Sequence, residues 1–157
     1  MTRLRTDIID VYVVRRAPRR LEVLQLRRVQ EPLAGTWQPV MGHARRAETA
    51  VACMWRELKE ETGLTRRSPA LRSVWALESV NPYFISAIDA IVVSARFVVE
   101  VADDWTPRLN HEHDDVRWVD VRHAPKFFLW PGQVAVAGEI RMLFLSRAGP
   151  RFAERIV

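Results

Sequence analysis

Short apolar runs rich in β-branched residues recur along the chain, and polar turns separate them, which is the pattern of strands. Strands are predicted at about Asp7 to Val14 and at Glu22 to Val29, and a short one just before Gly42. Further strand-like runs span Ser73 to Ser79, Phe84 to Val101 and the segment VRWVDV from position 116. The stretch DDWTPRLNHEHDD between the last two reads as a loop.

Two segments instead repeat their apolar residues at helical spacing. In the first, from Ala47 to Thr62, one sector gathers the apolar side chains and leaves the acidic ones accessible. The second runs from Ala124 or Pro131 to Ser146, and proline suits the first turn of a helix. Its apolar positions are Val136, Ile140, Leu143 and Phe144. Strands that enclose one helix, with a second helix closing the chain, predict an α/β fold.

Length and composition predict one soluble globular unit. The chain has 157 residues, of which 48% are hydrophobic and 27% charged, so a single domain over residues 1–157 is expected. Cys53 is the only cysteine, which excludes an intrachain disulfide.

No apolar run approaches the roughly 20 residues of a membrane span. Charged residues such as Arg96 interrupt the longest one, and Asp7 and Asp10 in the first strand argue against a signal peptide. A cytoplasmic protein with no membrane partner is therefore expected.

Arginine carries almost all of the net charge of +5. Such a balance suits a small-molecule polyphosphate or a nucleic acid. The arginines around Pro18 are interpreted as a solvated hairpin tip, and no RNA-recognition signature accompanies them, so a nucleic-acid partner is not expected.

The helix predicted from Ala47 to Thr62 carries the chemistry. Glu57, Glu60 and Glu61 stand at i, i+3 and i+4, so they project from one face. Carboxylates at this spacing repel one another unless a cation lies between them, and oxygen ligands without thiolate or histidine favour Mg²⁺ or Mn²⁺. Arg56 lies beside them, where it can hold a carboxylate. An ordinary solvated helix also carries such runs, but it has no need of Gly42 and Glu48 at fixed distances before it.

The stretch from Gly42 to Leu64 resembles the signature of the Nudix hydrolases. It reads G, five residues, E, seven residues, then RELKEETGL, and every fixed position of the signature is met. The resemblance implies an α/β/α sandwich with a mixed sheet that cleaves a diphosphate bond with Mg²⁺. By position, Glu57, Glu60 and Glu61 would bind the metal, together with the carbonyl of Met41 or Gly42. Glu48 and Arg56 would brace these acids.

A second acid site is predicted in the loop LNHEHDD. Glu112 precedes a strand with Trp118, and one group of Nudix enzymes has a similar glutamate that reaches the metal. Either Glu57 or Glu112 is then the base that activates water, and the spacing does not choose between them. His111 and His113 receive no role.

The segment WQPVMGH is similar to that of dihydroneopterin triphosphate pyrophosphatases and of dATP pyrophosphohydrolases. Candidate substrate contacts are Arg27 or Arg28 for phosphate, Gln38 of the same segment, and Trp37 or Tyr83 for a ring, although an aromatic residue is more often core.

Three hypotheses stand. The first is a Mg²⁺-dependent pyrophosphohydrolase acting on a nucleoside triphosphate or on dihydroneopterin triphosphate. The second is the same chemistry on a dinucleoside polyphosphate or a capped RNA end, for which Tyr83 is a weak pointer. The third is a Nudix-fold binding module without catalysis, which the retained acids disfavour. A homodimer is left open by the sequence.

Overall fold

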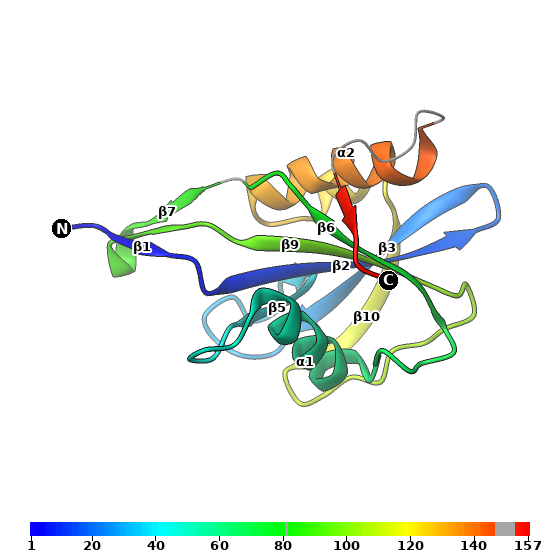
Figure 1. The fold of residues 1–157 in the computed structure, drawn as a ribbon, viewed down its shortest axis with the longest axis horizontal. Coiled ribbons are helices and arrows are strands. Elements are labelled where there is room, and N and C mark those ends of the chain that lie inside the picture. Colours follow the sequence, from blue (N-terminus) through cyan, green and yellow to red (C-terminus); the bar gives the residue numbers. More distant parts are fainter. Residues whose placement is uncertain (81, 147–152) are drawn as a thin grey trace.

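Two helices cover opposite faces of one mixed sheet in the computed structural model, which describes residues 1–80, 82–146 and 153–157 (Figure 1). The α/β/α sandwich predicted from the sequence is therefore confirmed. Its strands are β1 (Arg3–Arg5), β2 (Ile8–Ala17), β3 (Arg20–Arg28), β4 (Trp37–Gln38), β5 (Val40–His43), β6 (Leu71–Leu77), β7 (Tyr83–Ile85), β8 (Ala90–Val92), β9 (Ala95–Val101), β10 (His113–Asp120) and β11 (Ala153–Arg155). The helices are α1 (Ala50–Thr62), α2 (Pro131–Leu145) and the short 3₁₀ turns η1 (Ser86–Ile88) and η2 (Ala124–Lys126).

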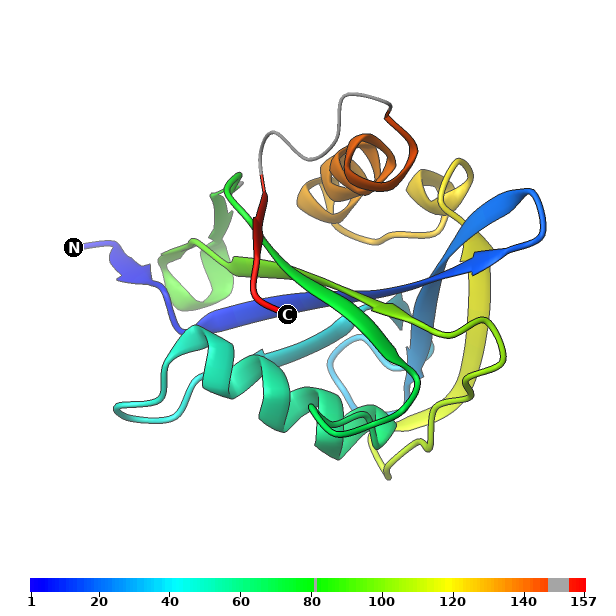
Figure 2. The same cartoon turned by 45° about the vertical axis from the view of Figure 1, so that its right-hand side comes forward.

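The central strand β2 holds the sheet together. The main strand order is β10-β3-β2-β9-β6-β11, with β4 added to β3 and β5 added to β2. The pairing of β2 with β9 is parallel, whereas β2 pairs antiparallel with β3 and β5. The final strand β11 runs along β6 (Figure 2).

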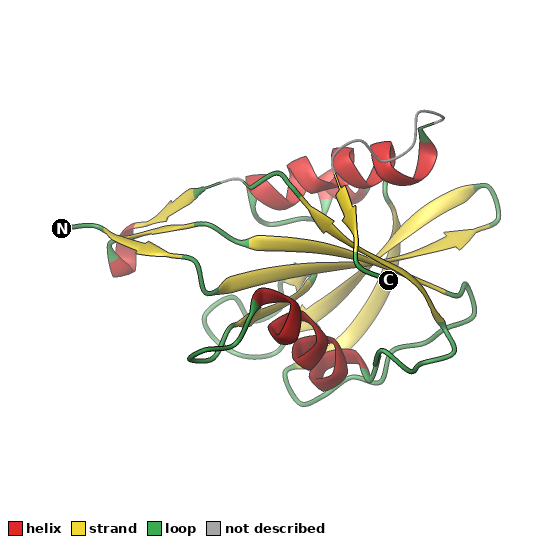
Figure 3. Cartoon of the chain, viewed as in Figure 1, coloured by secondary structure: helices red, strands yellow, loops and turns green. Residues whose placement is uncertain are grey.

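Each face of the sheet has its own apolar core. A helix covers each of these faces, which gives the two helical layers (Figure 3). Alternate residues of β2 supply both, because successive side chains of a strand point to opposite faces. Ile9 and Val11 pack with Met54 and Leu58 of α1. Tyr12 and Val14 pack on the other side with residues of α2 such as Ile140. A strand buried on both faces in this way becomes almost continuously apolar.

Helix α1 begins three residues later than the sequence pattern predicts. Ala47 has a left-handed backbone, with φ of 64°, and lies outside the helix. The Thr49 side chain caps the first turn by accepting a hydrogen bond from the Ala52 amide. At the other end Gly63, with φ of 75°, ends the helix in the conformation that glycine tolerates best. The caps thus fix α1 to thirteen residues and set the direction in which its acids project.

The predicted strand from Phe84 to Val101 is wrong as a single element. It divides into β7, η1, β8 and β9, and β7 and β8 form a separate small sheet with β1. Strand β10 also starts at His113, inside the predicted loop. The hairpin around Pro18 and the helix start at Pro131 are confirmed. Within the described residues no helix has the length and apolarity needed to cross a membrane.

Candidate active site

The acids of α1 face β5 across a cavity of about 610 Å³. Helix, strand and the loop before β10 all contribute to its wall. The residues predicted as site residues that line it are Arg28, Gln38, Met41, Gly42, Arg56, Glu57, Glu60, Glu61, Tyr83 and Glu112. The fold thus gathers acids that are far apart in the sequence into one hollow.

Arg56 binds three acids at once. Its Nε and Nη2 donate to the two carboxylate oxygens of Glu48, at 3.0 and 2.9 Å. Its Nη1 donates to Glu57 at 2.6 Å and to Glu60 at 3.3 Å, and Nη2 also donates to the carbonyl of His43. The bidentate bond from Arg56 lowers the pKa of Glu48 to about 2, so this acid is ionised at neutral pH. Arg56 thus links Glu48 to two acids of α1.

Gly42 leaves the space that Glu57 occupies. A Cβ atom at position 42 would lie 2.1 Å from Glu57 Oε1, far inside van der Waals contact. A side chain at this position would therefore force the Glu57 side chain to move. Burial raises the pKa of Glu57, and the negative charges of Glu60 and Glu112 raise it further, while Arg56 opposes them.

Glu61 is the most buried of the acids that line the cavity, with 2% of its surface exposed. Burial raises its pKa well above the usual value, and the charges of Glu57 and Glu112 add to the effect. A backbone hydrogen bond at Met41 acts in the opposite direction. Among the described residues its Oε2 has no hydrogen-bond partner. A buried carboxylate oxygen without a partner is costly, so it marks a place where a cation would be favourable.

His113 lies beside Glu61, although no sequence pattern predicted a role for it. Its Nδ1 is 3.8 Å from Glu61 Oε2, and its Nε2 is 3.1 Å from the amide nitrogen of Gln38. An amide nitrogen only donates, so Nε2 accepts and the ring proton lies on Nδ1, toward the acid. Burial lowers the pKa of His113 to about 4, and the charge of Arg28 contributes, so the ring is neutral at pH 7. Gln38 therefore orients a neutral histidine at the back of the acid cluster.

Glu112 comes from the loop before β10 and completes the acidic wall. Its backbone is fixed on both sides, because its amide donates to Asn110 Oδ1 and its carbonyl accepts from Val29. It lines the same cavity as Glu57 and Glu61, and its negative charge raises the pKa of both.

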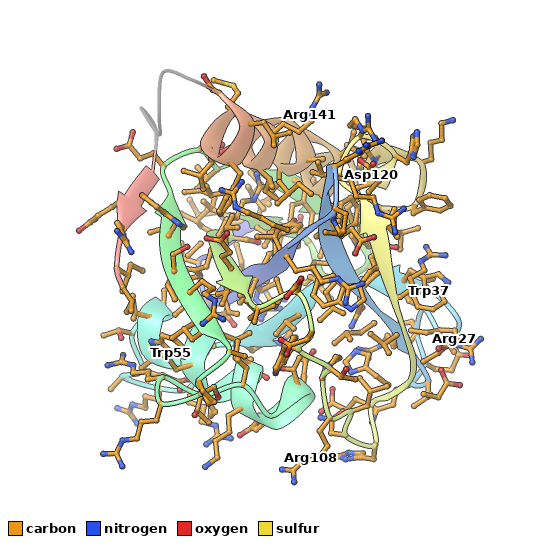
Figure 4. The ribbon with its side chains drawn as sticks, turned by 90° about the vertical axis from the view of Figure 1, so that its right-hand side faces the viewer. Arg27, Trp37, Trp55, Arg108, Asp120 and Arg141 are labelled. Carbon is orange, nitrogen blue, oxygen red and sulfur yellow. The ribbon has the colours of Figure 1, made fainter. Side chains whose placement is uncertain are left out.

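Arg27 and Trp37 do not reach the cavity, which corrects two of the predicted substrate contacts. They are partners in the pairing of β3 with β4, so they share the face that points away from the cavity. Arg27 donates to Asp114 at 2.7 Å, and its guanidinium lies 5.9 Å from the Trp37 ring centroid. Figure 4 places both side chains at the outer edge of the molecule. The neighbouring Arg28 and Gln38 line the cavity instead.

The oxygen atoms that could bind a metal in the cavity fit a hard divalent cation. Among the described residues no three acidic, histidine or cysteine side chains already converge as a ready metal cluster. Arg56 instead neutralises Glu57 and Glu60. The unpartnered Glu61 oxygen and the oxygen-only ligands around Gly42 fit Mg²⁺ or Mn²⁺. Glu57, Glu60, Glu61 and Glu112 are the side chains available to hold such an ion.

A sequence model of the NUDIX domain matches residues 5–137. The chain belongs to the Nudix family. Nudix enzymes are hydrolases of phosphoric anhydrides and generally use divalent metal ions. The matched region includes every acid that lines the cavity.

One sequence relative and two solved structures are similar to this chain. The chain is 34% identical over 117 residues to an octanoyltransferase of Myxococcus xanthus, and the match covers 72% of this chain but only 30% of that protein. Among solved structures, the dihydroneopterin triphosphate pyrophosphohydrolase of E. coli is similar with a TM-score of 0.71 at 18% identity, covering 86% of this chain and 96% of that one. An Ap4A hydrolase of C. elegans is similar with a TM-score of 0.70 at 18% identity, covering 85% and 93%. At this identity the two structures show a shared fold.

The raised pKa of Glu61 predicts how stability depends on pH in the metal-free protein. The unfolded chain releases this proton near the ordinary pKa of 4.5, whereas the folded chain retains it to higher pH, so folding loses stability as pH rises above 4.5. Glu61→Gln removes this loss. In EDTA its Tm is expected to exceed the wild-type Tm at pH 8, and the difference is expected to shrink at pH 4.

Glu78→Gln is the matched control, because Glu78 is exposed and lies outside the cavity. It is expected to show no comparable pH-dependent difference. A lower Tm for Glu61→Gln than for the wild type at pH 8 would contradict the raised pKa.

Proposed function

We propose that this chain is a Mg²⁺-dependent pyrophosphohydrolase. It cleaves a diphosphate bond in a nucleoside triphosphate or in dihydroneopterin triphosphate and releases pyrophosphate. The observation that carries the proposal is the buried Glu61 oxygen without a partner, set among further acids in an open cavity. Mn²⁺ suits the same oxygen ligands.

The residues of the cavity have different proposed roles in this reaction. The metal would be held by Glu57, Glu60 and Glu61, with Glu112 and a backbone carbonyl of Met41 or Gly42. Such an ion would neutralise phosphate oxygens and lower the pKa of a water. Glu57 or Glu112 would accept a proton from the water that attacks phosphorus. Arg56 and Glu48 keep the acids in place, and Arg28 lies on the cavity wall where it can meet a phosphate.

Dinucleoside polyphosphates are the second candidate substrates. The specific observation is that Tyr83 on the cavity wall stacks on Trp130, with ring centroids 6.0 Å apart and an angle of 23° between the planes. Such a pair offers a surface for a second base. The likeness to the Ap4A hydrolase supports the same reading.

Glu60→Gln tests the metal assignment. Glu60 is exposed, so the substitution leaves the core intact. Substituting a residue that only orients a metal ligand already lowers metal affinity or activity by about 10–100-fold. Loss of a direct ligand is therefore expected to lower kcat/KM by roughly 100-fold or more. The measurement is Mg²⁺-dependent release of pyrophosphate from nucleoside triphosphates and dihydroneopterin triphosphate, with Glu78→Gln as control. Unchanged hydrolysis by Glu60→Gln would contradict the assignment of Glu60 as a metal ligand.

Gly42→Ala tests the close approach of β5 to Glu57. The new methyl group would displace the Glu57 side chain, so the Mg²⁺ concentration for half-maximal activity is expected to rise by about 10-fold or more. Gly138→Ala is the matched control. Nothing lies within 4 Å of a Cβ at Gly138, so its activity is expected to equal that of the wild type, with stability gained by roughly 0.5–1 kcal/mol. Wild-type Mg²⁺ dependence in Gly42→Ala would contradict the role given to Glu57.

A further inference from the structure

A buried ion pair whose two members are not hydrogen-bonded to each other lies in the face of the sheet that α2 covers. Asp10 and Arg96 are only 4% and 3% exposed. Their nearest charged atoms, Asp10 Oδ2 and Arg96 Nε, are 3.9 Å apart, which is too far for a hydrogen bond. Among the described residues Asp10 Oδ1 and Arg96 Nε and Nη1 have no partner. Buried charges are ordinarily paired and hydrogen-bonded, so this pair calls for an explanation.

The register of three strands brings the two charges to one place. Asp10 of β2 is the pairing partner of Arg96 on β9 and of Met41 on β5. Paired residues project from the same face of a sheet, so the three side chains form a row. The opposite face carries Gly42 and the acids of α1. Asp10 and Arg96 therefore lie behind the acidic cavity, whereas Met41 lines it.

This row lines a second cavity of about 400 Å³, a volume in the range of small-molecule pockets. The start of α2, from Trp130 to Gln133, closes its other side, and Tyr83 stacks on Trp130 at its wall. Met41, Tyr83 and Trp130 line both this cavity and the acidic one. A ligand with phosphates among the acids can therefore place a planar ring between the aromatic pair and the Asp10–Arg96 pair.

The opposite charges of Asp10 and Arg96 on the cavity wall define the edge of that ring. A carboxylate only accepts hydrogen bonds and a guanidinium only donates them. The matching edge has two adjacent N–H donors for Asp10 and a carbonyl oxygen for Arg96. A 2-amino-4-oxopyrimidine ring has this edge, and guanine and pterins share it. Hypoxanthine lacks the amino group, and adenine has no carbonyl oxygen.

We infer that Asp10 and Arg96 form a specificity pocket for a 2-amino-oxo ring, such as guanine or a pterin, whose phosphate chain extends into the acidic cavity. The inference rests on the proposed function only for the phosphate part of the ligand. The ring part is tested by binding, without hydrolysis.

Nucleoside monophosphates contain no anhydride bond, so their binding is independent of catalysis. We expect isothermal titration calorimetry with Mg²⁺ to give at least about 10-fold tighter binding of GMP than of IMP, which differs only in the 2-amino group, and of AMP. The affinities of neopterin and of its 2-deamino analogue are compared in the same way. This comparison shows whether the pocket recognises the 2-amino group on a pterin ring as well as on guanine. Equal affinity for GMP, IMP and AMP, together with equal affinity for both pterins, would overturn the inference.

Asp10→Asn is expected to reduce the ratio of IMP to GMP dissociation constants to near 1. Asp104→Asn is the matched control, because Asp104 is exposed and lines neither cavity. It is expected to keep the wild-type ratio. Should Asp10→Asn fail to fold, the wild-type ratio alone decides. A preference for GMP without triphosphate hydrolysis would contradict the proposed function alone, and hydrolysis with no ring preference would contradict the pocket alone.

Discussion

The Arg56 guanidinium is the interaction on which the acidic cavity depends. It joins Glu48 from the loop before α1, Glu57 and Glu60 from the helix itself, and the carbonyl of His43 at the end of β5. One side chain thus ties helix, loop and strand together. Without it, like charges at helical spacing would repel one another and their side chains would turn toward solvent.

The arrangement also explains why the helix is at once buried and acidic. Leu58 and Met54 hold α1 against the sheet, while Gly42 lets β5 approach closely enough for Glu57 to fit beside its backbone. Burial raises the pKa of Glu57 and Glu61, so the site is electrostatically unfavourable until a cation enters. A stable scaffold therefore supports a local arrangement that is favourable only with a ligand, as is common at functional sites.

The acid helix, the hairpin at Pro18 and the helix from Pro131 were predictable, because periodicity and local signals determine each of them. The start of α1 was not, since the caps lie in the backbone conformation at Ala47 and the side chain of Thr49. Nor could the sequence divide Phe84 to Val101, where apolar residues continue through two turns.

Strand register explains the features of the two cavities that the sequence could not predict. Arg27 and Arg28 are neighbours on β3, as Trp37 and Gln38 are on β4, and successive residues point to opposite faces. Only the pairing of the strands decides which member of each pair meets the cavity. The same holds for Asp10 and Arg96. A charge inside an otherwise apolar strand was visible in each case, but their juxtaposition needed the pairing of β2 with β9.

We propose that Glu57, Glu60 and Glu61 form a cradle for a divalent cation, and anomalous X-ray scattering from crystals soaked in Mn²⁺ tests whether they do. We expect an anomalous peak within about 2.3 Å of carboxylate oxygens of these residues, with the Arg56 side chain still bound to Glu48. A protein that binds Mn²⁺ only elsewhere, or a cradle that stays free of metal at saturating Mn²⁺, would contradict it.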